Sequence, residues 1–82
     1  MLSIQQLKER IESSRRLRER APFESGIKIA EQSIRFHSGR LQVYRAEDNR
    51  PMIRYCKKKI KQAKSDLGYW IGKLAEYDRA AS

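Results

Sequence analysis

The chain has 82 residues, which suffices for one domain and lies near the lower size at which a single hydrophobic core is enough. Hydrophobic residues make up 39% and charged residues 35%, and only two prolines and four glycines occur, so the composition excludes collagen-like, low-complexity and disordered classes. The 19 lysines and arginines outnumber the 10 acidic residues to give a net charge of +9, which predicts attraction to polyanions or acidic protein surfaces.

The first expected helix covers residues 3–20. Ser3 and Gln6 have the spacing of a capping box, and Leu2 and Leu7 occupy the positions of a hydrophobic staple. Its apolar stripe is short and consists of Ile4, Leu7 and Ile11. The stripe then gives way to an arginine-rich segment that contains Arg15, Arg16, Arg18 and Arg20.

The second expected helix covers residues 22–47, because Pro22 suits the first position of a helix and Glu24 favours the positive end of its dipole. Its apolar positions recur in steps of three and four, which indicates one buried face. They are Ile27, Ala30, Ile34, His37, Leu41 and Tyr44. The polar residues 47–50 predict a turn.

The third expected helix covers residues 51–79, begins at Pro51, and takes Asn49 or Arg50 as its cap. It has the longest regular apolar face in the chain. That face consists of Ile53, Cys56, Ile60, Ala63, Leu67, Trp70, Leu74 and Tyr77. Two apolar faces of matching period, joined by a short turn, predict an antiparallel helical hairpin with shallow, coiled-coil-like crossings.

The sequence therefore predicts a single all-α domain over residues 1–82. A long antiparallel hairpin forms its main part, and the shorter N-terminal helix completes either a three-helix bundle or a dimeric helical bundle. One cysteine, Cys56, excludes an internal disulfide framework and suits a reducing compartment. Charges interrupt every apolar stretch, so we expect neither a signal peptide nor a membrane span, and we expect a cytoplasmic protein.

The second helix carries a further apolar line, formed by Ile29, Phe36 and Val43 with Gly39 beside it. This line lies about 130° around the helix from the main apolar face. The simplest expectation is that the N-terminal helix covers it. The alternatives are a protein partner or a second copy of the chain, and the short stripe of the N-terminal helix favours a homodimer that packs through Phe36, Gly39 and Val43.

No residue pattern in the chain indicates an enzyme. His37 is the only histidine and falls on the main apolar face, so we expect it to be packed and hydrogen-bonded, and Cys56 to be buried and inert. No metal-ligand spacing, phosphate-binding loop or catalytic triad can be assembled. We therefore expect no metal, no cofactor and no small-molecule substrate.

The candidate binding surface is basic. Between Arg54 and Lys64 the third helix has no acidic residue, and its outer side carries Arg54, Lys57, Lys58, Lys61 and Lys64. Tyr55 and Tyr69 are expected on the outer surface, where they could stack on unpaired bases. Together with Arg15, Arg16, Arg18 and Arg20, these residues predict a nucleic-acid-binding module, although a basic helix face also has the simpler role of keeping a protein soluble.

The alternative function is that of an inhibitor or adaptor that docks on an acidic or nucleic-acid-binding groove of a larger protein. Charge would steer the encounter, while Phe36, Val43, Tyr55 or Tyr69 would act as anchors. In size and charge alone, the chain is similar to small basic helical proteins of phages and plasmids that bind host enzymes.

Overall fold

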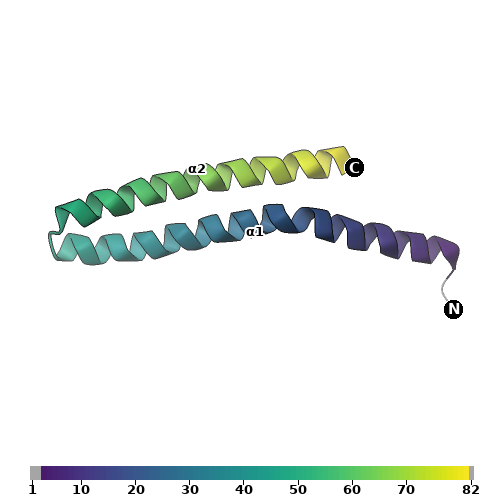
Figure 1. Ribbon diagram of the computed structural model, residues 1–82, viewed down its shortest axis with the longest axis horizontal. Coiled ribbons are helices and arrows are strands. Elements are labelled where there is room, and N and C mark those ends of the chain that lie inside the picture. The colour runs from purple at the N-terminus through teal and green to yellow at the C-terminus, as the bar shows by residue number, and fades with distance from the viewer. Residues whose placement is uncertain (1–2, 82) are drawn as a thin grey trace.

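The computed structural model describes residues 3–81, which form two long antiparallel helices (Figure 1). Helix α1 runs over Ile4–Ala46 and helix α2 over Arg50–Ala81, and these described residues contain no strand. The hairpin is a thin rod with principal extents of 66 × 25 × 11 Å. The predicted all-helical antiparallel hairpin is confirmed.

The predicted three helices are wrong, because α1 continues through Pro22 and joins the expected segments 3–20 and 22–47. The chain therefore cannot form a three-helix bundle on its own. α2 also begins one residue before the expected start at Pro51 and ends two residues beyond the expected end at residue 79.

Pro22 lacks an amide hydrogen and its ring crowds the preceding turn, which costs about 3 kcal/mol in a helix interior. Contacts with α2 hold the helix on both sides of the proline. Before it, Glu19 accepts a hydrogen bond from Tyr77, and after it the Phe23 ring centroid lies 6.0 Å from that of Tyr77. Figure 1 shows α1 bending near its middle, so that the N-terminal part turns away from α2, as a proline kink does.

The predicted helix start and turn are confirmed in detail. Ser3 and Gln6 form the capping box, with Gln6 N donating to Ser3 Oγ at 3.2 Å and Ser3 N donating to Gln6 Oε1 at 3.1 Å. The staple partner Leu2 lies outside the described residues. At the turn, Asn49 Oδ1 accepts from Met52 N at 3.4 Å, so Asn49 is the cap of α2.

The core between the helices is narrow. Every predicted position on the two main apolar faces is buried or half-buried, but the fully buried residues within 3–81 are only Ala30, Cys56 and Ala63. All three side chains are small, which lets the two backbones approach closely. The larger residues of each face are half-buried along the edges, so a single hairpin removes little apolar surface from water.

The second apolar line is uncovered, with 66% of Ile29, 61% of Phe36 and 44% of Val43 exposed. The expectation that the N-terminal helix covers this line is wrong. Because residues 4–21 continue the axis of α1, they cannot fold back onto another part of the same helix. Gly39 beside the line is open as well, since a Cβ atom there would meet nothing within 4 Å.

Candidate functional site

The outer side of α2 carries a continuous basic surface, which we call the lysine ridge. It consists of Arg54, Lys57, Lys58, Lys61 and Lys64, all of which are exposed. At about 1.5 Å per residue the ridge is about 15 Å long, and at about 100° per residue it covers an arc of about 120°. Among residues 3–81, none of the five forms an ion pair or a hydrogen bond with a side chain, so their charge is available to a partner.

Tyr55 and Tyr69 are exposed on the flank of α2 beside the lysine ridge. Lys59 Nζ lies 5.5 Å from the Tyr55 ring centroid, and Lys73 Nζ lies 5.6 Å from that of Tyr69. Each ring is thus an aromatic surface with a cation at its face. Such a pair can stack on an unpaired base while the ammonium meets a phosphate.

The arginine-rich segment lies apart from the lysine ridge. It lies near Tyr77 and Asp78 at the open end of the hairpin. Tyr77 is about 20 Å along α2 from Lys64, the last residue of the lysine ridge. Arg15 pairs with Glu19 at 3.1 Å, and Arg20 pairs with Glu24 at 3.6 Å and with Asp78 at 3.4 Å. Of this segment, Arg16 and Arg18 are the arginines without an ion pair within residues 3–81.

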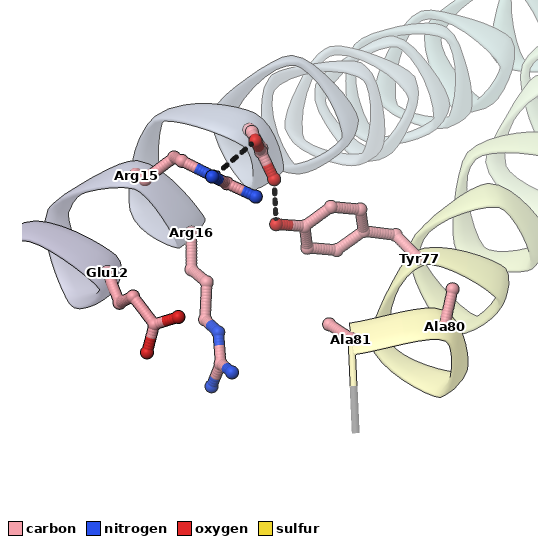
Figure 2. A pocket seen from close by; sticks show the side chains of 7 residues that line it. Glu12, Arg15, Arg16, Tyr77, Ala80 and Ala81 are labelled. Carbon is pink, nitrogen blue, oxygen red and sulfur yellow. Dashed lines mark hydrogen bonds and ion pairs between the residues drawn. The ribbon is translucent and has the colours of Figure 1, made fainter. Parts of the chain in front are cut away.

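A shallow hollow of about 260 Å³ opens where the helices diverge (Figure 2). Its lining combines two arginines, two glutamates and a tyrosine with small residues at the end of α2: Glu12, Arg15, Arg16, Glu19, Tyr77, Ala80 and Ala81. Because the carboxylates balance the guanidinium groups, the hollow has no net charge that would attract a phosphate. It is therefore a weaker candidate for anion binding than the lysine ridge.

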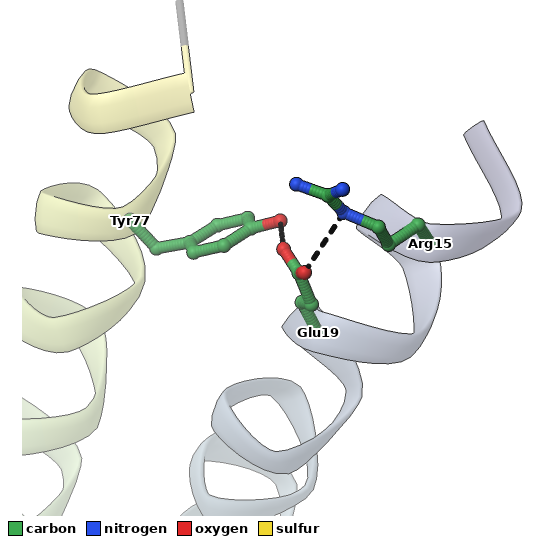
Figure 3. Close-up of polar contacts among 3 residues, drawn as sticks. All are labelled: Arg15, Glu19 and Tyr77. Carbon is green, nitrogen blue, oxygen red and sulfur yellow. Dashed lines mark hydrogen bonds and ion pairs between the residues drawn. The ribbon is translucent and has the colours of Figure 1, made fainter. Parts of the chain in front are cut away.

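Glu19 links the two helices at this end (Figure 3). One carboxylate oxygen accepts a hydrogen bond from the Tyr77 hydroxyl, and the other accepts a hydrogen bond from Arg15 Nε at 3.1 Å. The hydrogen bond to Glu19 raises the pKa of Tyr77; desolvation and the Glu19 charge act in the same direction, whereas Arg15 and Arg16 act against it. Sequence reasoning placed Tyr77 on the apolar face and missed this polar contact.

This contact predicts a pH dependence of stability. The folded-state pKa of Tyr77 is raised above its ordinary value of about 10, so its contribution is complete below about pH 10 and is lost as the pH rises through the folded-state pKa. We expect wild type to exceed Tyr77→Phe in melting temperature at pH 8, and this difference to shrink above about pH 10. Circular dichroism melts of both proteins measure it.

Tyr69→Phe serves as the matched control, because no hydrogen bond of the Tyr69 hydroxyl is found within residues 3–81. Its melting temperature should follow that of wild type across the same pH range. A constant difference between wild type and Tyr77→Phe at all pH values would contradict the hydrogen bond to Glu19.

His37 and Cys56 have the structural environments predicted for them. His37 Nδ1 lies 2.8 Å from the backbone oxygen of Ser33, to which it donates when that nitrogen carries the proton, and Cys56 is fully buried. No group of three or more potential metal-ligating side chains occurs in the described part of the chain. Nor does either helix, over its described length, contain an apolar stretch that could cross a bilayer.

Phe23 is a contact residue that sequence reasoning missed. Its ring centroid lies 6.4 Å from that of Trp70 and 6.0 Å from that of Tyr77. The signal was available, since Phe23 stands four positions before Ile27 and extends the same apolar spacing backwards. The assumed helix boundary at Pro22 concealed it.

Comparison of the chain with protein families, with curated proteins and with solved structures found no match. Its function must therefore be argued from its own side chains.

Proposed function

We propose that the protein is a non-enzymatic nucleic-acid-binding module that holds a phosphate backbone along the lysine ridge. The observation that supports this proposal is the set of five exposed cations on one side of α2 without an ion-pair partner among residues 3–81. Nucleic acids attract such surfaces because binding releases the counterions condensed on the phosphates.

The shape of the ridge favours contact with the backbone over recognition of a base sequence. The ridge lies on the convex outer side of a helix, and lysines bind phosphate as point charges without the fixed geometry of an arginine fork. The flanking Tyr55 and Tyr69 favour a strand with unpaired bases. We therefore propose binding that depends little on sequence, with Arg16 and Arg18 adding contacts only for a strand that continues along the rod.

A salt titration tests this function. If all five cations contact phosphates, the slope of log K against log salt is about −4.5 for a duplex and about −3.5 for a single strand. Raising salt from about 50 to 200 mM then weakens binding by about 100-fold to 500-fold. Fluorescence anisotropy with labelled mixed-sequence DNA and RNA measures the slope, and absence of binding at low salt would contradict the proposal.

Paired substitutions test the ridge itself. The double variant Lys58→Ala, Lys61→Ala removes two contacts, so the duplex slope should fall in magnitude by about 1.8. The double variant Lys8→Ala, Arg10→Ala removes the same charge from an exposed part of α1 far from the ridge and is the matched control. Equal slopes for the two variants would mean that net charge, and not the ridge, governs binding.

An inhibitor or adaptor function is the second candidate, and the exposed side chains of Phe36 and Val43 support it. In that case apolar anchors would dominate the affinity for a protein partner, and charge would mainly set the association rate. Capture of a host protein that is abolished by Phe36→Ala, but only slowed by Lys58→Ala with Lys61→Ala, would favour this function over nucleic-acid binding.

A further inference from the structure

Exposed apolar residues lie on one side of α1 in two stretches, residues 4–11 and 29–43. Because α1 is a single helix, the N-terminal stripe and the second apolar line share one axis, and at about 100° per residue their members fall within an arc of about 60°. We call the combined set the outer line; it consists of Ile4, Leu7, Ile11, Ile29, Phe36 and Val43. Between 44% and 74% of each residue is exposed.

No part of the described chain is placed to cover the outer line. α2 packs on the main apolar face of α1, which lies about 130° around the helix from the outer line. Ile29 borders α2, where it lines a hollow with Lys59 and Gln62, but it stays 66% exposed. The last turn of α2 lines the hollow beside Glu12 and Arg15, and Figure 1 shows the N-terminal end of α1 projecting beyond it. A helical end without tertiary contacts is marginal in water, so packing against another surface would stabilise this end.

The exposed area points to a second copy of the chain as that surface. A compact monomer of 9.7 kDa exposes about 5,100 Å². The hairpin exposes 6844 Å², and this area exceeds that of the compact monomer by about 1,700 Å². A stable interface buries about 800 Å² on each partner, and obligate homodimers bury more, so the excess matches the area that such a dimer removes from water.

We propose that two copies pair through their outer lines with the α1 helices antiparallel. The interval from Ile4 to Ile11 equals the interval from Phe36 to Val43, so in one register Ile4 faces Val43 of the second copy and Ile11 faces Phe36. A two-fold axis near Pro22 then makes both halves of the interface identical and closes the dimer. Each projecting N-terminal end then covers residues 36–43 of the other copy, whereas Ile29 faces Arg18 of the other copy.

The middle of the outer line and the lysine ridge fit this arrangement. The stretch nearest the two-fold axis contains Arg18, Pro22 and Ser25 in place of large apolar residues, so the apolar contacts form two separate patches. The lysine ridge lies on α2, away from the pairing side of α1, and stays free in each copy. Self-association therefore does not depend on the proposed nucleic-acid binding.

Sedimentation equilibrium on the full chain, at about 5 to 100 µM, tests the dimer. Wild type should give twice the 9.7 kDa mass of the chain. Ile11→Asp and Phe36→Asp should each raise the dimer dissociation constant by about 100-fold or more, because each buries two unpaired carboxylates per dimer. Ile71→Asp is the matched control, since Ile71 is 51% exposed on α2 and lies off the outer line.

A wild-type monomer throughout this range would overturn the proposal. So would a dimer that resists Ile11→Asp, since the N-terminal end would then lie outside the interface. The salt dependence of each equilibrium distinguishes self-association from nucleic-acid binding. Screening of like charges should leave the dimer unchanged or tighter at higher salt, whereas the same salt weakens binding to nucleic acid.

Cysteine cross-linking tests the register and does not require a destabilising charge. In a Cys56→Ser background, Ile11→Cys combined with Phe36→Cys should form a covalent dimer under mild oxidation, because the two positions face each other across the interface. Ile11→Cys combined with Ile71→Cys is the control and should stay monomeric on a non-reducing gel. Equal cross-linking by Ile11→Cys alone would indicate parallel helices and overturn the pairing.

Discussion

Pro22→Ala is expected to raise the free energy of unfolding by about 3 kcal/mol, which corresponds to a rise in melting temperature of about 12 to 24 °C. The proline lies inside α1, where it removes a backbone hydrogen bond and crowds the preceding turn. Alanine removes both penalties and has the highest helix propensity. Chemical unfolding monitored by circular dichroism, at one fixed protein concentration, measures the change.

Ser25→Ala is the matched control, because Ser25 is exposed in the same helix and lacks the proline ring. It should stabilise the protein by no more than about 0.5 kcal/mol. If Pro22→Ala gives no larger gain than this control, α1 is broken at Pro22 in solution. The three-helix prediction that local sequence rules favour would then be correct.

Gly26 and Trp70 are expected to show a double-mutant interaction energy of about 3 kcal/mol. A Cβ atom on Gly26 would lie 2.4 Å from Trp70 Cδ2, against a rigid indole ring. Gly26→Ala should therefore destabilise wild type by about 2 kcal/mol, because overpacking outweighs the gain in helix propensity. In a Trp70→Ala background the clash is absent, and the same substitution should stabilise by about 1 kcal/mol.

Gly72→Ala controls for propensity, since a Cβ atom on Gly72 would meet nothing within 4 Å. It should stabilise by about 1 kcal/mol in both backgrounds, and urea unfolding at fixed protein concentration measures all the variants. The decisive result is the change of sign at Gly26. A stabilising Gly26→Ala in wild type would show that α1 and α2 are not in close contact at this position.

The sequence by itself determined the features that depend on near neighbours. The steps of three and four in residues 53–77 identified the buried face of α2, and Ser3 with Gln6 identified the start of α1. Asn49 before Pro51 located the turn. Each of these signals acts within one or two helical turns, so it is complete in a short stretch of sequence.

Only the tertiary structure decided whether Pro22 begins a helix or lies inside one. Local preference favours the first position, but Tyr77 of α2 contacts Glu19 before the proline and Phe23 after it. Those contacts join residues more than fifty positions apart, and no local pattern records them. The continuity of α1 in turn extends the N-terminal stripe beyond α2 and separates the arginine-rich segment from the lysine ridge. It also leaves Phe36 exposed, because a continuous helix carries its residues along its axis and cannot cover its own side.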